Sequence, residues 1–328
     1  MDKLPRVGIT IGDAAGIGPE ISLKAIADPE LRSACRPVLI GDATVLRRSA
    51  DEFGTDLTLV NFGDHEENAV EVVDLNNLPG HFKIGVDAEV TGRASAQNIE
   101  AAVDLWRSSD IDAICTAPIS KKAISLAGYD FPGHTEFLAQ LTGTEEFRMS
   151  FFAGQLRTVL LSTHVSLLEG IDLVRMPALI KLIDFTNREM GKLLGREVSI
   201  AVAGLNPHAS EGGMFGDQER LEISPAIEHC REKGIDVSGP YSPDTIFLRG
   251  FRGDFDVVIA LYHDQATIAV KSLSFGSGVN VTLGLPLIRT SVDHGTAYDI
   301  AGRGVADASS MVAAIKLAGE LVLGSPTK

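Results

Sequence analysis

The sequence predicts a two-domain α/β protein whose sheets are mainly parallel and carry helices on both faces. Short apolar runs rich in β-branched residues alternate with longer stretches whose apolar residues recur at helical spacing. Such alternation is typical of parallel sheets covered by helices. The chain has 328 residues, more than a single hydrophobic core usually holds, so we expect two domains.

The expected strands are short apolar runs with the length of buried strands. They are Arg6–Ile11, Val38–Ile40, Leu57–Val60, Ala113–Thr116, Met149–Ala153, Arg157–Ser162, Val198–Ala203 and Val257–Tyr262. A helix is expected to open at Pro19-Glu20, since proline and an acidic residue suit a helix N-terminus. Further helices are expected over about 43–53, 94–107, 177–194, 223–233 and 309–322. Residues 61–90 break this pattern and are interpreted as an acidic surface excursion without chemistry.

The composition indicates an ordinary soluble globular protein with a strongly acidic surface. Hydrophobic residues make up 45% of the chain, charged residues 22%, and the formal net charge is −15. This charge argues against non-specific binding to nucleic acid or to anionic membranes. The three cysteines form no CxxC pair, and no apolar run has the length of a transmembrane helix. We therefore expect a cytoplasmic protein in which an anionic substrate would need a local cationic pocket.

Three histidines stand at or just beyond the C-terminal ends of apolar strands. His164 follows VLLST, His208 follows IAVAGLNP and His263 follows VVIALY. In an open parallel sheet these ends share one edge, where ligands bind. Three imidazoles there would form a site with open positions, as catalytic zinc and related ions require. The alternative is that each histidine is hydrogen-bonded separately in its loop, but three matching positions favour the metal.

Other special residues gather between Val257 and Gly304. Lys271 and Arg289 lie among glycine and apolar neighbours, which favours an anion site over ordinary surface charge, because arginine can grip a phosphate bidentately. Earlier in the chain, GDAAGIGPE forms a glycine-rich turn between a strand and a helix. It is not the GxGxxG dinucleotide fingerprint. A tight structural turn explains it as well as a binding loop does.

The chain resembles the 4-hydroxythreonine-4-phosphate dehydrogenase family across nearly its whole length. The segments that carry the resemblance are GDAAGIGPE, GHTEF, AGLNPHASEGG, GPYSPDTIF, YHDQ, GVNVTLGLPLIRTSVDHGTA and DIAGRG. HGTAYDIAGRG and the GIGPE turn are also similar to their counterparts in the isocitrate and isopropylmalate dehydrogenases. The resemblance implies an isocitrate/isopropylmalate dehydrogenase-like fold of two α/β domains. Residues 1–135 with 290–328 would form the cofactor side, and residues 136–289 would bind metal and substrate and dimerise.

The resemblance also implies the residues of the site. One divalent ion, Zn, Mg, Mn or Co, would be bound by His164, His208 and His263. The substrate and its phosphate would be held by His134, Thr135, Lys271, Asn280 and Arg289. NAD or NADP would lie at Gly12, His294, Gly295, Thr296, Ala297 and Asp299. NAD is preferred, although Arg303 could meet a 2′-phosphate. The candidates for the catalytic base are Asp244, Asp264 and His134.

The implied activity is the NAD(P)-dependent oxidation of a phosphorylated hydroxy acid, followed by decarboxylation of the β-keto acid, in pyridoxine biosynthesis. Two departures from the family pattern leave the substrate open. Ala14 replaces a proline, and Ala266–Ala269 replace Gly-x-x-Pro in residues expected to line the pocket. D-Erythronate or D-threonate 4-phosphate and a terephthalate-type dihydrodiol are alternative substrates, although HTEF, Lys271 and Arg289 favour a phosphate.

Two other classes of protein stay open. A phosphotransacetylase-like acyltransferase shares the architecture but needs no three-histidine site. A metal-storing or regulatory protein could keep the fold without the chemistry. Metal dependence and NAD reduction would separate these classes from a dehydrogenase.

The resemblance further implies a homodimer with its active sites in interdomain clefts at the subunit interface. The apolar run Gly278–Ile288 is either an internal strand or an exposed surface that a second subunit covers. The resemblance favours the interface, with metal ligands drawn from both subunits.

Overall fold

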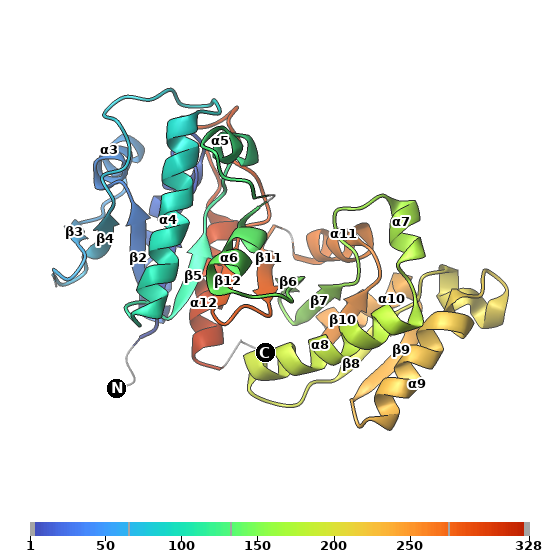
Figure 1. Cartoon of the computed structure of the whole chain (residues 1–328). Coiled ribbons are helices and arrows are strands. Elements are labelled where there is room, and N and C mark those ends of the chain that lie inside the picture. The colour runs from blue at the N-terminus through green and yellow to red at the C-terminus, as the bar shows by residue number, and fades with distance from the viewer. Residues whose placement is uncertain (1–3, 65, 132, 275, 325–328) are drawn as a thin grey trace. The chain divides into compact units, whose positions relative to one another are not determined.

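The computed structural model in Figure 1 describes residues 4–64, 66–131, 133–274 and 276–324. Strands and helices alternate along these ranges, which confirms the predicted α/β class. The chain divides into two compact units: unit 1 comprises Met1–Phe147 and Leu285–Leu323, and unit 2 contains Arg148–Gly284. The sequence placed the first boundary at 135/136, which would cut through helix α6 (His134–Thr142). It placed the second at 289/290.

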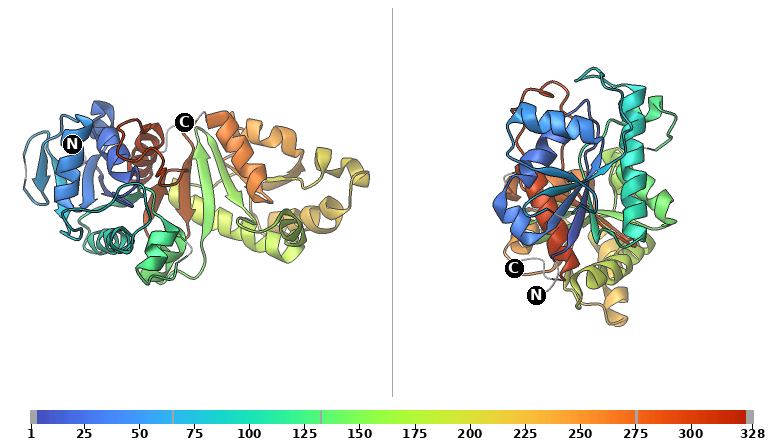
Figure 2. Two further views of the ribbon diagram at one scale, coloured as in Figure 1. Left: turned by 90° about the horizontal axis from the view of Figure 1, so that it is seen from above. Right: turned by 90° about the vertical axis from the view of Figure 1, so that its left-hand side faces the viewer.

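The sheet of unit 1 is parallel, with the strand order β3-β4-β2-β1-β5-β12. Its strands are β1 (Arg6–Thr10), β2 (Arg36–Gly41), β3 (Leu59–Asn61), β4 (Val70–Asp74), β5 (Ala113–Thr116) and β12 (Ile288–Ser291). Its helices are α1 (Gly18–Ile26), α2 (Pro29–Ala34), α3 (Ala43–Phe53), α4 (Glu89–Arg107), α5 (Lys121–Leu126), α6 and α12 (Ser309–Val322). Helix α4 covers one face of the sheet and α12 the other (Figure 2). Ile99 and Val103 of α4 are buried against Ile40 and Ile114 of the sheet.

Strand β4 lies inside the stretch interpreted from the sequence as an acidic surface excursion. Val70 and Val72 are buried, and β4 pairs with β2 in parallel. Glu71 between them is also buried, because Arg6 at 2.6 Å and Arg36 at 3.7 Å neutralise its carboxylate. The interpretation is therefore wrong over β4, since an acidic side chain can occupy a strand when its charge is paired.

The sheet of unit 2 has the strand order β11-β6-β7-β10-β8-β9. Strand β6 runs antiparallel to β11 and β7, while β7, β10, β8 and β9 are parallel. The strands are β6 (Arg148–Ala153), β7 (Leu156–Leu160), β8 (Ile200–Ala203), β9 (Val237–Tyr241), β10 (Val257–Ala260) and β11 (Val279–Leu283). The helices are α7 (Leu167–Asp172), α8 (Met176–Leu194), α9 (Ser224–Glu232), α10 (Pro243–Phe251) and α11 (His263–Ser274), with left-handed turns within Pro207–Gly213 and a π-helical turn at Glu219–Ile223. Helices α10 and α11 pack on one face of this sheet, and α8 lies on the other (Figure 2).

Helix α11 begins at His263, where the sequence analysis expected no helix. Ala266–Ala269, which replace the family's Gly-x-x-Pro, lie within it and contain no residue that would end a helix. Ala266 is buried in the core of unit 2, whereas Ile268 is 65% exposed. The substitution therefore changes core packing and one surface position.

The apolar run Gly278–Ile288 is not an exposed surface. Strand β11 takes up its first half, and Val279, Val281 and Leu283 are each at most 3% exposed. The argument for an interface at this run is therefore wrong, because the internal-strand alternative describes it. A homodimer has to be argued from other residues.

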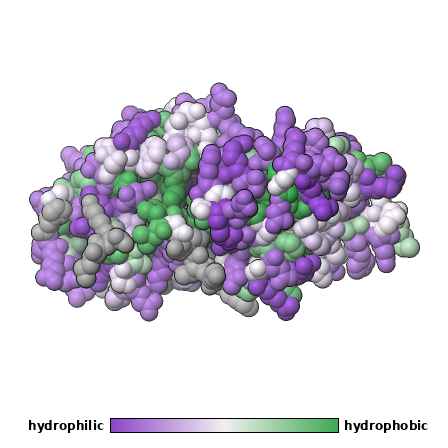
Figure 3. Space-filling view, turned by 90° about the horizontal axis from the view of Figure 1, so that it is seen from below, coloured by the Kyte–Doolittle hydropathy of each residue, from purple (hydrophilic) through white to green (hydrophobic). Residues whose placement is uncertain are grey.

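The surface drawn in Figure 3 is predominantly hydrophilic, in keeping with the acidic composition. Within the described ranges, no helix combines the length and the apolar character needed to cross a bilayer.

Candidate active site

Three histidines of unit 2 follow the carboxyl ends of parallel strands. His164 comes after β7, His208 after β8 and His263 after β10, each three to five residues beyond the last residue of the strand. Strand β10 lies between β7 and β8, so the three segments leave the same edge of one sheet. Ligands of open α/β sheets bind at this edge.

His164 and His263 share a pocket of about 270 Å³, which Ser162, Tyr262 and Asp264 also line. Their ring centroids are 5.8 Å apart. Asp264 Oδ1 lies 2.7 Å from Nδ1 of His263. A carboxylate accepts hydrogen bonds, so in this pair Nδ1 of His263 is the donor when Asp264 is ionised. A carboxylate orients metal-binding imidazoles in this way in many proteins.

His208 does not join the other two histidines. Its Nδ1 lies 4.0 Å from Oδ2 of Asp244. In the parts of the chain that the structure describes, no three histidine, cysteine, aspartate or glutamate side chains lie close enough to hold a metal ion. The structure thus brings together two of the three predicted ligands. The pair that meets offers imidazole nitrogens, which suit zinc and related divalent ions.

The glycine-rich turn after β1 permits close backbone packing in unit 1. Gly12 has a φ of +65°, and a Cβ there would stand 2.2 Å from the carbonyl oxygen of Pro118. The amide of Ile17 donates to the carbonyl of Thr296 at 3.0 Å. The turn therefore packs on the His294–Ala297 turn, where the family resemblance implies that the cofactor binds.

Asp13 and Tyr298 join the same two turns. The Tyr298 hydroxyl donates to Oδ2 of Asp13 at 2.8 Å, and the Ala15 amide donates to Oδ1 at 2.8 Å. Asp13 is completely buried, and burial raises the pKa of its carboxyl while these two bonds oppose the shift. Burial also raises the pKa of Tyr298 above its usual range, so the hydroxyl remains a donor at neutral pH.

The predicted cofactor turn itself is open to solvent. His294, Gly295 and Asp299 are exposed, and Thr296 is half-buried. Ala297 has a φ of +44°, in the left-handed region that residues with a Cβ rarely adopt. Such backbone strain persists where the surroundings impose it, and it is common at ligand-binding turns.

Helix α1 holds the chain just after this turn. Lys24 Nζ donates to the carbonyls of Gly304 at 2.8 Å and Ala306 at 3.0 Å. Glu20, paired with Lys24 at 2.7 Å, accepts from the Ala306 amide at 2.8 Å. Helix α1 therefore holds the segment after the turn through two of its carbonyl groups and one of its amides.

Arg289 and His134 lie close together in unit 1. Arg289 is 3% exposed in β12 and donates from Nη2 to Oγ1 of Thr116 at 2.8 Å. Burial lowers the pKa of Arg289 to about 10, which leaves the guanidinium charged at neutral pH. Burial, together with the charge of Arg289, holds the pKa of His134 well below its usual value, although a bond to the backbone of Ala117 acts in the opposite direction. The imidazole is therefore neutral, and its buried Nε2 has no hydrogen-bond partner among the described residues.

The other predicted substrate residues are divided between the units. Thr135 follows His134 at the start of α6 in unit 1. Lys271 is exposed on α11 of unit 2. Asn280 is half-buried in β11, and its Oδ1 has no hydrogen-bond partner within the described ranges.

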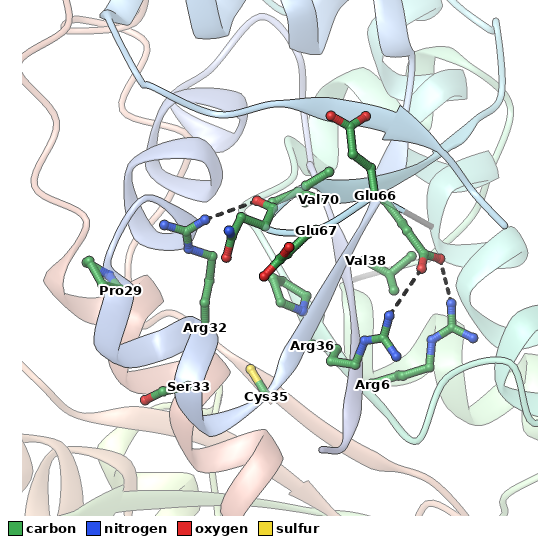
Figure 4. Close-up of a pocket in the computed structure, with 14 residues that line it drawn as sticks. Arg6, Pro29, Arg32, Ser33, Cys35, Arg36, Val38, Glu66, Glu67 and Val70 are labelled. Atoms are coloured by element: carbon green, nitrogen blue, oxygen red, sulfur yellow. Dashed lines mark hydrogen bonds and ion pairs between the residues drawn. The ribbon is translucent and has the colours of Figure 1, made fainter. Parts of the chain in front are cut away.

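A second pocket of about 520 Å³ lies in unit 1 at the opposite, amino ends of the strands (Figure 4). Arg6 and Arg36 stand at the beginnings of β1 and β2, and both pair with Glu71. Arg32 donates to the carbonyl of Asn68 at 3.2 Å. All three arginines are therefore bound to groups of the protein. We interpret the pocket as the site of the ion pairs that neutralise Glu71 in β4, and not as a ligand site.

The fold, and the residues gathered at its strand ends, are those of an α/β enzyme. The family described as "Pyridoxal phosphate biosynthetic protein PdxA" matches residues 33–318. The chain belongs to this family, and the family expected from its motifs is thereby confirmed.

Relatives with named activities match the chain over nearly its whole length. A D-threonate 4-phosphate dehydrogenase of Cupriavidus necator is 44% identical over 98% of both chains. The crystal structure of a 4-hydroxythreonine-4-phosphate dehydrogenase from Burkholderia phymatum is 43% identical, with a TM-score of 0.86 over 98% of this chain and 99% of that one. A terephthalate 1,2-cis-dihydrodiol dehydrogenase from Burkholderia xenovorans LB400 is 31% identical, with a TM-score of 0.65 over 96% and 97%. These relatives are dehydrogenases, which supports an oxidoreductase.

The sequence did not reveal the residues that support the site by hydrogen-bonding to other site residues or to the strand ends that carry them. Asp13 could have been noticed as an acidic residue inside a glycine-rich turn. Tyr298 and Thr116 gave no local signal, because their partners Asp13 and Arg289 are distant in the sequence. Gln265, next to two residues that were noticed, is buried and hydrogen-bonded on both sides.

Proposed function

We propose that this protein is an NAD(P)-dependent, metal-dependent dehydrogenase of a four-carbon hydroxy acid that carries a phosphate on carbon 4. Oxidation of the carbon-3 hydroxyl would give a β-keto acid, which would then lose carbon dioxide. The observation that carries the proposal is the whole-length identity to two dehydrogenases named for such phosphorylated substrates, 44% and 43%.

Arg289 is the proposed anchor for the phosphate. A buried guanidinium that stays charged binds an anion more strongly than one in water, because the local dielectric is low. Lys271 would supply a second positive charge and Asn280 a polar contact. His134 and Thr135, at the start of α6, would contact the part of the substrate near the reacting carbon.

His164 and His263 are proposed to hold a divalent ion, with His208 as the third ligand. When bound, the ion would polarise the substrate hydroxyl as a Lewis acid, and the nicotinamide would accept the hydride. Asp264, at 2.7 Å from Nδ1 of His263, would orient the imidazole ring toward the ion.

His134 is the proposed acceptor of the hydroxyl proton. Of the other two candidates, Asp264 is occupied by His263 at 2.7 Å, and Asp244 accepts from the Ser242 hydroxyl at 2.6 Å. Burial and, after it, the charge of Arg289 lower the pKa of His134. A phosphate bound at Arg289 would offset this charge and raise the pKa of His134, so the base would strengthen when the substrate binds.

The nucleotide is proposed to lie on the exposed turn His294–Ala297, followed by Asp299. Gly12 and Gly295 allow close approach of a ligand to the backbone. The strained Ala297 and the bond between Asp13 and Tyr298 support a turn that is held in one conformation.

Two substrates of this class remain candidates. 4-Hydroxythreonine 4-phosphate carries an amino group on carbon 2, where D-threonate 4-phosphate carries a hydroxyl, and identities of 43% and 44% do not separate them. D-Erythronate 4-phosphate differs from D-threonate 4-phosphate only in configuration. A dihydrodiol is less supported, since the relative named for it is 31% identical.

A homodimer is proposed from the surface of unit 2. Large apolar side chains are 46–73% exposed on the three segments that follow the histidines. They are Leu167, Leu168, Met214, Phe215 and Ile268. Exposed apolar residues of this kind mark contact surfaces, and a two-fold dimer is the commonest way to cover them. A second copy would also supply the third imidazole that one chain does not bring to the pair.

The test is a substrate panel. The purified protein is mixed with each of the three 4-phosphates and with the terephthalate dihydrodiol, with NAD or NADP, and with each divalent ion or a chelator. We expect NADH formation and carbon dioxide release with one 4-phosphate, and loss of both with the chelator. Acetyl transfer between acetyl phosphate and coenzyme A without nucleotide reduction would instead indicate the acyltransferase, and metal binding without turnover would indicate the storage or regulatory protein.

A further inference from the structure

A chain of buried hydrogen bonds joins the strand ends that carry the histidines of unit 2. Ser162 Oγ donates to the carbonyl of Leu261 at 3.0 Å. Gln265 accepts from the amide of Leu261 at 2.7 Å and donates from Nε2 to the carbonyl of Gly204 at 2.8 Å. The connection therefore runs from the end of β7, across the end of β10, to the end of β8.

Glu219 extends this chain toward His208. Its Oε1 accepts from the amides of Leu205 at 2.8 Å and Asn206 at 2.7 Å, and its Oε2 accepts from the Asn206 side chain at 2.8 Å. The backbone beyond is left-handed from His208 to Glu211, with φ between 46° and 66°. Such a run is costly for residues with a Cβ, so it needs a rigid support on its N-terminal side.

Burial makes these three side chains specific for one backbone arrangement. Ser162 is 5% exposed, Gln265 8% and Glu219 3%. A buried polar group that loses its partner retains its full desolvation cost, so any shift of one strand end against another is penalised.

The anchored positions lie just before the proposed metal ligands. Ser162 precedes His164 by two residues, Leu261 precedes His263 by two and Gly204 precedes His208 by four. Metal–nitrogen distances tolerate errors of only about 0.2 Å. A displacement of a strand end would therefore directly change the positions of the metal-binding histidines.

We propose that Ser162, Gln265 and Glu219 are positioning residues that fix the strand ends carrying His164, His208 and His263, so that His164 and His263 are presented together to a divalent ion while His208 is held apart from them. This inference rests on the proposed metal site. Each is proposed to act through the backbone that carries a histidine; Ser162, which also lines the pocket of His164 and His263, does so through its bond to the Leu261 carbonyl.

The test measures binding of Co²⁺ alone to the full-length, chelator-stripped protein by visible absorption. The variants are Ser162→Ala, which removes one hydroxyl, and Gln265→Met, which keeps the length of the side chain without its polar atoms. Each should weaken Co²⁺ binding by about tenfold or more. The matched control is Ser22→Ala in unit 1, which removes a buried hydroxyl that donates to the Gly18 carbonyl at 2.8 Å and should leave binding unchanged.

Urea denaturation of the metal-free variants separates positioning from stability. A lowered urea midpoint with wild-type Co²⁺ affinity in Ser162→Ala would show a merely structural role and overturn the inference. Loss of binding in His263→Ala, with full binding in Ser162→Ala, would overturn it while leaving the metal site standing. A wild-type protein that binds no Co²⁺ would overturn both. If Gln265→Met does not fold, Ser162→Ala still decides.

Discussion

The hydroxyl of Tyr298 lies 2.8 Å from the carboxylate of Asp13, although the two residues stand 285 positions apart in the chain. One residue belongs to the glycine-rich turn after β1, and the other follows the exposed turn proposed to bind the nucleotide. The bond fastens the second turn to the first. Because Asp13 is buried, the tyrosine contact also limits the cost of its charge.

We predict that Tyr298→Phe weakens nucleotide binding. Loss of a hydrogen bond to a charged group costs roughly 1.5 kcal/mol or more, which corresponds to about a tenfold rise in KM for NAD or NADP. The value of kcat should stay within about twofold, since the hydroxyl touches no reacting atom. Steady-state kinetics with a saturating hydroxy acid measure both quantities.

The control for this variant is Tyr129→Phe, also in unit 1. Tyr129 packs its ring near Phe131 and Phe137, with centroids 6.1 and 5.8 Å away. Its nucleotide KM should remain at the wild-type value. Equal KM values in both variants would show that the bond to Asp13 does not organise the turn.

The sequence predicted those elements whose signal is local. Apolar β-branched runs gave β1, β7 and β10, and helical spacing of apolar residues gave α8 and α4. Strand β4 was missed because Glu71 is acceptable there only through two arginines brought from other strands. Helix α11 was missed because its first residues were read for their chemistry and not for their spacing.

The candidate site, like the fold, was predictable only where its signal is local. Strand ends drew attention to three histidines, but only the structure shows that His164 meets His263 while His208 stands near Asp244. The loop geometry that separates them depends on the left-handed run beginning at His208, which contains a single glycine in its first five residues. Nothing in residue type alone predicts such a backbone.

Arg289→Lys should impair phosphate binding even though the charge is kept. Lysine cannot present two parallel donors to a phosphate, and the substitution would also remove the 2.8 Å hydrogen bond from the guanidinium to Oγ1 of Thr116. We expect KM for the phosphorylated substrate to rise by roughly 10- to 100-fold, equivalent to about 1.5–3 kcal/mol. The same hydroxy acid without its phosphate is the control, and its KM should not change. A parallel rise for both compounds would indicate general damage to β12.

Inorganic phosphate should raise the pKa of His134. At present burial and the charge of Arg289 hold this pKa well below its usual value, and an anion at Arg289 would remove part of the second cause. The imidazole signals can be followed by NMR titration with and without phosphate. His81, an exposed histidine of unit 1, is the internal control, and its signals should not respond to added phosphate. If phosphate leaves the titration of His134 unchanged, the charge of Arg289 does not control the pKa of the proposed base.

Asp256 predicts acid-sensitive stability in unit 2. Burial opposes its ionisation, but Arg196, which donates to both carboxylate oxygens, and the Ser199 amide at 2.9 Å outweigh burial and lower the pKa from 3.8 to about 2. A carboxylate with a lowered folded pKa stabilises the fold above its unfolded pKa, and this contribution is lost as the pH falls through the folded value. Because Arg196 is exposed to solvent, screening reduces this contribution, and Asp256→Asn should lower the free energy of unfolding at neutral pH by roughly 1–2 kcal/mol.

The difference from wild type should shrink as the pH falls from about 4 to about 2, measured by urea denaturation at each pH. Asp254→Asn is the control, because its partner Arg249 is an exposed neighbour at 3.0 Å. It should change stability by less than about 1 kcal/mol throughout. A pH-independent loss in Asp256→Asn would mean that the charge is not the cause.

The division of the three histidines between subunits can be read from complementation. Single His→Ala variants at His164, His208 and His263 should each be inactive, and they are mixed in the three possible pairs under conditions that exchange subunits. If one ligand comes from the second copy, a mixed dimer regains one intact site whenever that ligand and one of the others are the mutated pair. Two mixtures then recover activity, up to about half the wild-type sites in each mixed dimer, and the third mixture stays inactive because both of its mutated ligands serve the same site from the same chain. The inactive mixture therefore identifies the pair that one chain supplies, and the contact between His164 and His263 leads us to expect that pair.

Exchange is verified by mass spectrometry of isotopically labelled subunits. If exchange occurs and all three mixtures remain inactive, all ligands belong to one chain, and His208 must move to the other two when the ion binds.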